Sequence, residues 1–539
     1  MPQIRIENIL GGHSPLTNFS NSGQFRASLG IDPGQPMDDT DSKYSTIASG
    51  LIRPTASQKF SSTTIQKSPL WIKSNPKTNT VYVYDAQSSA YTIDSTMTTV
   101  TALNDRGLLS GLGNGMAYYD NYMYFAKNTD ILRYGPLNGT ASFSLDANMS
   151  YWVTTLAKTA LVNTTYPVTY LNSLQIPNHH LHRHSDGRLY IADVVGNTGT
   201  IHYIQTSKTT VEGDTNNGST YDALDMGYGL WPTVIESYGT DLAIALFEGF
   251  SDSANPQNNV RQKRAKIAFW DTTALSANKI VWVEFPDTII TAMKNINGTL
   301  YVVSGNHTNQ GFRVTKFVGG YTFEEVYYSE TGEPCLQGAI DGTLNRVLMG
   351  SHTTVPESDG CVYSYGLQKT GLGNGMFNVM RATGGTSSTS VTAVLLADNS
   401  ELGFYAPIIG WTQAGDGSTG VSHGLDKQGT EYNHAPSVYW SEMFRIGQHF
   451  KLTKIRIPLV QSVTTNMTII PKIYTDDGNG TTYTLTTINN TNYNGKNYID
   501  YKLDNTTGRN NFWLELRHSG IALLTVGLPI IISYELTEE

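Results

Sequence analysis

The stretch DGRLYIAD (residues 186–193) joins a polar turn to a short apolar strand, and six further stretches of the chain have the same form. They are TNTVYVYD (78–85), DNYMYFAK (120–127), GTDLAIAL (239–246), NGTLYVVS (297–304), DGTLNRVL (341–348) and NSELGFYA (399–406), and the turns are anchored on Asn79, Asn121, Gly187, Thr240, Gly298, Gly342 and Ser400. Intervals of about 40 to 70 residues suit a unit of four short strands with variable loops, as in propeller blades. The repeats predict a seven-bladed β-propeller over residues 66–410.

The composition favours the same fold class. Charged residues make up 15% of the 539 residues, whereas about 25% is typical of soluble domains. Thr, Asn, Ser, Gly and Tyr take their place. Because β-branched and aromatic side chains fit a pleated surface and Asn and Gly tolerate tight turns, we expect an all-β protein.

Three further regions flank or follow the repeats. Residues 1–65 are polar and rich in Gly, Pro and Ser, which predicts an extended N-terminal arm that is either disordered or laid over a neighbouring surface. Residues 411–435 are expected to form a Gly-rich linker. Residues 436–539 contain eight apolar stretches separated by turns such as DDGNG, which predicts a C-terminal β-sandwich of jelly-roll type.

Charge and apolar content exclude several kinds of partner. The net charge of −9 argues against nucleic acid, since binding to phosphates requires concentrated positive charge. The first residues, MPQIRIENILGGHSP, do not resemble a signal peptide, and the most apolar stretch, 521–532, is interrupted by Gly527 and Pro529. We therefore expect synthesis in a cytosol and no membrane insertion. The two cysteines, Cys335 and Cys361, are expected to be free and buried.

The densest group of chemically versatile residues is NHHLHRHSD (178–186). Strand alternation would place His180, His182 and His184 on one face, where neutral imidazoles could bind zinc or iron. The alternative is a polar strand that forms hydrogen bonds near the propeller channel or at a subunit contact. The three histidines are thus a candidate transition-metal site, and no other cofactor is expected.

Signals for catalysis are sparse. The chain lacks the Ser-x-Asp-x-Gly-x-Thr-Trp box of sialidase-like propellers and the Gly-x-Ser-x-Gly elbow. Carboxylates such as Glu236, Asp241 and Glu248 belong to no motif. A glycosidase acting on polysaccharides would instead need two carboxylates about 5 to 10 Å apart at the propeller centre.

Several stretches resemble virion structural, tail-associated proteins of tailed bacteriophages. They are IENILGGHSPLTNFSNSGQFRASLGIDPGQP (6–36), NGMAYYDNYMYFAKNTDILRYGPL (114–137), SKTTVEGDTNNGSTYDALD (207–225) and WPTVIESYGTDL (231–242). The resemblance covers residues 1–410 and implies a non-enzymatic virion component that assembles with other virion proteins and with copies of itself. It supplies no catalytic residues.

The C-terminal sandwich is similar only in a general way to adhesion or carbohydrate-binding modules. Its aromatic side chains, including Trp440, Tyr474, Tyr483 and Trp513, could contact a host surface glycan. A polysaccharide-degrading glycosidase, or depolymerase, on a propeller scaffold is the alternative function.

Overall fold

The computed structural model is built almost entirely of β-strands. It describes the chain except residues 1, 8–11, 14–23, 30, 33–51, 53, 61–64, 88, 104–114, 128–129, 147–178, 196, 206–218, 249–263, 274–279, 307–310, 331, 344–345, 352–359, 368–373, 385–388, 400–403, 414–421, 430–436, 477–480 and 538–539. The predicted all-β class is confirmed.

Seven four-stranded antiparallel sheets follow one another along the described part of the chain. The first three comprise β5 (Pro69–Ser74), β6 (Val81–Asp85), β7 (Ala90–Ile93) and β8 (Val100–Ala102); β9 (Gly115–Tyr119), β10 (Tyr122–Ala126), β11 (Ile131–Gly135) and β12 (Ser142–Leu145); and β13 (Leu181–Arg183), β14 (Leu189–Val195), β15 (Thr198–Ile204) and β16 (Ser219–Tyr228).

The fourth to sixth sheets continue the series, and the seventh ends on a strand from the beginning of the chain. These sheets comprise β17 (Leu230–Tyr238), β18 (Asp241–Glu248), β19 (Lys266–Trp270) and β20 (Val281–Glu284); β21 (Ile289–Ile296), β22 (Thr299–Gly305), β23 (Phe312–Gly319) and β24 (Thr322–Ser329); β25 (Ile340–Thr343), β26 (Arg346–Gly350), β27 (Cys361–Leu367) and β28 (Asn374–Arg381); and β29 (Thr389–Asn399), β30 (Phe404–Gln413), β31 (Ser422–Gly429) and β4 (Ala56–Lys59).

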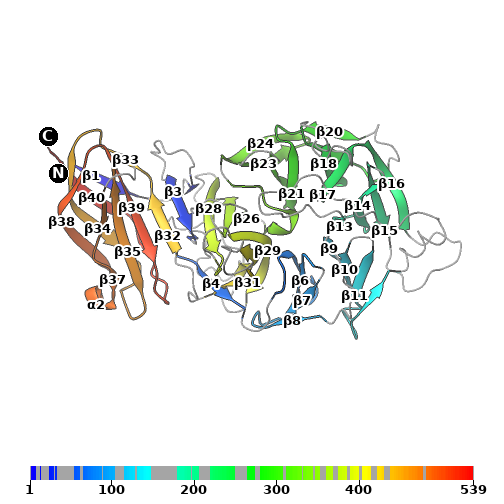
Figure 1. Ribbon diagram of the computed structural model, residues 1–539, viewed down its shortest axis with the longest axis horizontal. Helices are drawn as coiled ribbons and strands as arrows, with labels where there is room; N and C mark the ends of the chain where they lie inside the picture. The colour runs from blue at the N-terminus through cyan, green and yellow to red at the C-terminus, as the bar shows by residue number, and fades with distance from the viewer. Residues whose placement is uncertain are drawn as a thin grey trace.

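The first strands of these sheets form a closed ring. Each packs against the first strand of the next sheet, from β5 through β9, β13, β17, β21 and β25 to β29, and β29 packs against β5 again. Figure 1 shows the sheets arranged around a common centre in a propeller-like way. The ring brings seven strands that are far apart in sequence to one central region.

Five of the seven predicted turn anchors lie between the first two strands of a sheet, whereas Gly342 lies within β25 and Ser400 lies outside the described residues. Asn79 and Asn121 occupy the turns β5–β6 and β9–β10, where they have φ values of 56° and 66°. Gly187 and Gly298 occupy the corresponding turns of the third and fifth sheets, with φ values of 84° and 82°. Positive φ explains why Asn and Gly recur at this position.

The predicted Gly-rich linker at 411–435 is wrong. Residues up to Gln413 belong to β30, and Ser422–Gly429 form β31, which pairs with both β30 and β4. Gly424 has a packing reason, because a Cβ there would clash with the ring of Trp411. Residues 411–413 and 422–429 are therefore part of the seventh sheet.

Two more sheets contain the C-terminal strands, and we call them the C-terminal sheet pair. One comprises β1 (Gln3–Ile6), β40 (Ile530–Leu536), β34 (Phe450–Pro458) and β38 (Tyr498–Gly508); the other comprises β2 (Gly12–His13), β3 (Gln24–Leu29), β32 (Ser437–Ser441), β39 (Asn511–His518), β35 (Thr468–Thr475) and β36 (Thr482–Thr484), with β33 (Phe444–Arg445) on β39 and β37 (Ile488–Asn489) on β35. A short helix, α2 (Asn490–Tyr493), follows β37. The apolar stretch 521–526 forms isolated bridges at Ala522 and Val526 and no strand.

The described parts of the N-terminal segment belong to both assemblies. β1 and β3 pair with β40 and β32 of the C-terminal sheet pair, whereas β4 completes the seventh ring sheet. A buried ion pair joins Asp32 Oδ2 to Arg346 on β26 at 2.8 Å. Ile52 and Val526 exchange backbone hydrogen bonds.

The ring and the C-terminal sheet pair also share apolar packing. One buried cluster contains Val303 and Met349 of the ring together with Ile455 and Leu514 of the C-terminal sheets. Cys335 and Cys361 are free and buried, as predicted. No helix in the described residues is long and apolar enough to cross a membrane.

Candidate functional site

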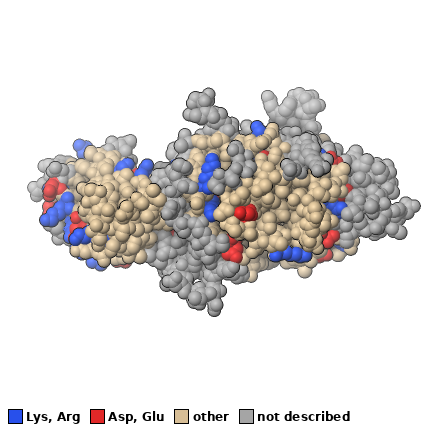
Figure 2. Space-filling model, turned by 90° about the horizontal axis from the view of Figure 1, so that it is seen from below, with Lys and Arg blue, Asp and Glu red and all other residues tan. Residues whose placement is uncertain are grey.

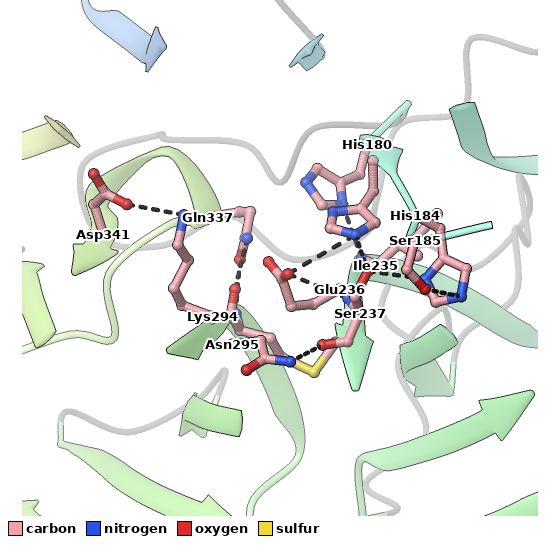
Figure 3. Close-up of polar contacts among 12 residues, drawn as sticks. His180, His184, Ser185, Ile235, Glu236, Ser237, Lys294, Asn295, Gln337 and Asp341 are labelled. Atoms are coloured by element: carbon pink, nitrogen blue, oxygen red, sulfur yellow. Dashed lines mark hydrogen bonds and ion pairs between the residues drawn. The ribbon is translucent and has the colours of Figure 1, made fainter. Parts of the chain in front are cut away.

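A group of ionisable side chains converges at the centre of the ring, and we call it the channel cluster. It consists of Lys73 on β5, His182 on β13, Glu236 on β17, Lys294 on β21 and Asp341 on β25. Figure 3 shows Glu236, Lys294 and Asp341 directed towards this centre from three different strands. Five of the seven first strands therefore contribute to one polar site.

Backbone register places these residues at one level of the ring. Lys73, His182 and Lys294 pair with Tyr82, Tyr190 and Tyr301, which follow the first apolar residue of the second strand in their repeats. Glu236 pairs with Ala243 at the equivalent position of the fourth repeat. Asp341 pairs with Leu348 at the same position of the sixth repeat, so the cluster arises because one position of the repeat faces the ring centre in these five sheets.

Lys294 and Asp341 form the strongest contact of the cluster. Lys294 Nζ lies 2.8 Å from Asp341 Oδ1, and Asp341 Oδ2 accepts a hydrogen bond from the backbone N–H of Leu396 at 2.8 Å. Burial alone would raise the pKa of Asp341, but Lys294 and Lys73 outweigh it and lower this pKa. Burial likewise opposes the charge of Lys294, but Asp341 and Glu236 raise its pKa above the usual value. Both groups are therefore ionised at neutral pH.

The pKa values of Glu236 and Lys73 are shifted towards neutral pH. Burial raises the pKa of Glu236 to about 7, despite the nearby ammonium groups of Lys294 and Lys73. Burial, followed by repulsion from Lys294, lowers the pKa of Lys73 to about 8. Both side chains can therefore gain or lose a proton near neutral pH, unlike ordinary surface Glu and Lys residues.

The histidines come from the third sheet and lie beside Glu236 of the fourth sheet. His180 Nδ1 accepts a hydrogen bond from the N–H of Ile235 at 2.8 Å, and His182 Nε2 lies 2.7 Å from Ser237 Oγ and 3.8 Å from Glu236 Oε1. Burial and the nearby Lys73 lower the pKa of His180 to about 3. Burial, together with His180 and His184, lowers the pKa of His182 well below its usual value. These two rings are neutral.

His184 connects this group to the turn of the fourth sheet. Its Nε2 lies 3.1 Å from the carbonyl oxygen of Thr240, which can only accept, so Nε2 carries a proton. Nδ1 lies 2.8 Å from Ser237 Oγ, which also lies 2.7 Å from His182 Nε2. The result is a hydrogen-bonded chain from His182 through Ser237 and His184 to Thr240.

The predicted metal site at His180, His182 and His184 is not formed. The three side chains do share one face, but their nitrogens bond to Ile235, Ser237 and Thr240 instead of converging on one point. No group of three His, Cys, Asp or Glu side chains in the described residues could hold a metal ion. The hydrogen-bonded alternative near the channel describes these histidines better.

A short 3₁₀ turn, η3 (Gln337–Ala339), lies inside the ring next to the channel cluster. It contacts β5, β21 and β29, which belong to three different sheets. The side chain of Gln337 holds it in place, because Oε1 accepts from the N–H of Met293 and Nε2 donates to the carbonyl of Met293, both at 2.7 Å. Glu236, Asp341 and Lys294 nevertheless keep 11%, 13% and 24% of their side-chain area accessible.

Such an arrangement can bind polar groups and exchange protons at neutral pH. The pKa values of Glu236 and Asp341 are also shifted in opposite directions. Many hydrolases pair an acid and a base in this way. Glu236 was expected to belong to no motif, and Lys73, Lys294 and Asp341 were not predicted as site residues. The available signal was an isolated charged residue inside an apolar first strand, a few residues before each repeat turn.

The aromatic residues of the C-terminal sheet pair are mostly engaged within the protein. Tyr474 stacks on Trp513 with ring centroids 5.2 Å apart, and Trp513 is 4% exposed. Tyr474 Oη and Trp440 Nε1 both donate to Glu515 Oε2, at 2.6 Å and 3.1 Å. Tyr483 Oη lies 3.4 Å from the carbonyl of Thr507. Tyr474 and Trp440 stay partly accessible.

Comparisons with known proteins add fold likenesses only. No protein-family model and no curated protein sequence matches the chain. Among solved structures, the chain is similar to an exo-β-1,3-galactanase from Phanerochaete chrysosporium (8% identity, TM-score 0.28, 68% of this chain and 98% of that one). It is also similar to virginiamycin B lyase from Staphylococcus aureus (10%, 0.38, 69% and 98%) and to the β-propeller domain of Cps50 (Swd1) from Myceliophteria thermophila (9%, 0.38, 68% and 98%). At these values the likenesses say nothing about activity.

Proposed function

We propose that the protein is a non-enzymatic, tail-associated structural protein of a bacteriophage virion. In this proposal the seven sheets are the blades of a β-propeller, and the C-terminal sheet pair is a jelly-roll-like β-sandwich. The observation that carries it is the path of the N-terminal segment, whose strands complete sheets in both assemblies. Such interlocking suits a component whose task is to keep a fixed shape under mechanical load.

The closed ring suits this task for a second physical reason. Four of its seven outermost strands, β4, β8, β12 and β20, have only three or four residues, so these four sheets present short edges to unwanted pairing. The face in Figure 2 carries few charged side chains among the described residues, in keeping with the low charge content. Polar, weakly charged surfaces of this kind suit contacts with other virion proteins and with further copies of the chain. Recognition of host surface glycans through the sandwich is the second part of this proposal.

Quantitative mass spectrometry of purified virions of the encoding phage tests the structural role. A structural component is expected at a fixed copy number that matches the symmetry of the tail, and it should withstand washing in high salt. A chain that is absent from purified particles, or present only in trace amounts, would rule out the proposed role.

A polysaccharide-degrading glycosidase is the second candidate function, and one observation favours it. Glu236, whose pKa is raised to about 7, and Asp341, whose pKa is lowered, both face the channel cluster. A protonated acid and an ionised carboxylate are the two groups that glycoside hydrolysis requires.

Release of reducing ends from host capsular polysaccharide tests this second candidate. The enzyme hypothesis predicts activity that Glu236→Gln abolishes, with Glu284→Gln as a control because Glu284 lies on the fourth strand of its sheet and is exposed. The structural proposal predicts no activity in any of the three proteins. Cleavage by the wild type that Glu236→Gln removes would replace the structural proposal with the enzymatic one.

A further inference from the structure

The ammonium group of Lys73 has an unusual environment within the channel cluster. Lys294, Asp341, Glu236, His180 and His182 are close enough to interact with it electrostatically. No described carboxylate lies within ion-pair distance of Lys73 Nζ, which lies over the ring of Trp71, 5.7 Å from its centroid. Lys294, by contrast, has its carboxylate partner at 2.8 Å.

Lys73 is half-buried. An ammonium that loses part of its hydration without gaining an anionic partner is destabilising. The surrounding groups do not remove this cost. Asp341 is engaged by Lys294 and by the N–H of Leu396, while Oε1 of Glu236 accepts from the N–H of Ser237 at 3.2 Å. Neither Asp341 nor Glu236 therefore forms an ion pair with Lys73.

We propose that the centre of the ring is a binding site for a small oxyanion, held by the ammonium group of Lys73 between the fifth-sheet lysine Lys294 and the neutral imidazole of His182. A carboxylate or a phosphate group supplies the acceptor oxygens that Lys73 lacks. The Nε2–H of His180, which follows from acceptance by Nδ1, offers a further donor on the same face. Two sources carry this chemistry, namely the carboxylate of an acidic sugar and free inorganic phosphate. The site goes beyond the structural role and does not depend on it.

Binding at this site takes up protons. An anion beside Lys73 stabilises the ammonium form, and the same anion repels ionised Glu236 and stabilises its protonated form. With the pKa of Lys73 lowered to about 8 and that of Glu236 raised to about 7, both groups gain protons on binding near pH 7.5. Affinity should therefore fall as the pH rises above about 8.

Isothermal titration calorimetry with glucuronate and with inorganic phosphate, at pH 6.5, 7.5 and 9, tests the proposal. The two titrants distinguish the sources, because binding of glucuronate alone assigns a sugar carboxylate and binding of phosphate alone assigns phosphate. Heats measured at pH 7.5 in two buffers of different ionisation enthalpy should reveal net proton uptake. Absence of binding by both anions at pH 6.5 overturns the proposal.

Three variants locate the site. Lys73→Met should weaken binding at least about tenfold, because a charge-assisted hydrogen bond is lost. Lys77→Met removes the same charge from the exposed β5–β6 turn and should bind as the wild type does. Glu236→Gln removes the repulsive carboxylate and should bind more tightly at pH 7.5 with reduced proton uptake, a gain that misfolding cannot produce. Unchanged affinity in both Lys73→Met and Glu236→Gln would place the anion elsewhere and refute the assignment.

Discussion

The ion pair between Asp32 and Arg346 should be a main attachment of the N-terminal segment to the ring. Both side chains are 4% exposed, and Arg346 also donates from Nε to Ser364 Oγ at 2.6 Å. Asp32→Ala leaves the guanidinium of Arg346 buried without this carboxylate, so the free energy of unfolding should fall by about 3 to 5 kcal/mol. Replacing both partners with apolar residues avoids the buried charge, so Asp32→Leu with Arg346→Met should regain most of that stability.

Urea unfolding followed by tryptophan fluorescence measures these differences. A matched control is Asp500→Ala, because Asp500 pairs with Arg456 at 2.7 Å on the surface, where the two side chains are 30% and 47% exposed. Because water screens this exposed pair, Asp500→Ala should cost clearly less stability than Asp32→Ala. The reasoning is refuted if Asp32→Ala costs no more than Asp500→Ala, or if the double variant is as unstable as the single one.

Three further predictions concern the ring. An acid whose pKa is raised in the folded state binds its proton more tightly there, so ionisation of Glu236 should lower the stability of the wild type as the pH rises from about 4.5 to about 7. Glu236→Gln should therefore be about 3 kcal/mol more stable than the wild type at pH 8 and equally stable at pH 4. The same difference in stability at both pH values would contradict this. Gly338→Ala should clearly lower the melting temperature, because a Cβ there would clash with the carbonyl oxygen of Leu70. Gly139→Ala should leave the melting temperature unchanged, because the atom nearest to its added Cβ would be 3.8 Å away. Equal melting temperatures of the two variants would show that η3 is not packed inside the ring. Elemental analysis should find no stoichiometric zinc or iron bound through the histidines, and His182→Ala should leave the metal content unchanged. If the wild type binds one equivalent of metal and His182→Ala loses it, the histidines form a metal site after all.

The repeated hairpins could be predicted because their signal is local. Asn79, Asn121 and Gly187 occupy tight turns with positive φ, and the apolar residues after them must alternate along a strand. The role of the N-terminal segment could not be predicted in the same way. The pairing of β4 with β31 joins residues more than three hundred positions apart, and nothing in either stretch specifies the other.

The channel cluster illustrates the same limit for function. Lys73, Glu236 and Lys294 are single charged residues inside apolar strands of separate repeats, and they meet only because the ring closes. The histidine stretch was conspicuous for the opposite reason, since its residues are adjacent in sequence. Its face was predicted correctly, but the partners of the ring nitrogens come from Ile235, Ser237 and Thr240 on another sheet. Distant partners, and not the local pattern, decide whether such residues bind metal.

A cryo-EM reconstruction of the intact tail of the encoding phage tests the central proposal most directly. We expect density for a ring of seven four-stranded sheets at a fixed, symmetry-related position, with strand β4 in the seventh sheet and contacts to neighbouring subunits. A tail whose density is fully explained by other proteins, with no place for this ring, would contradict it.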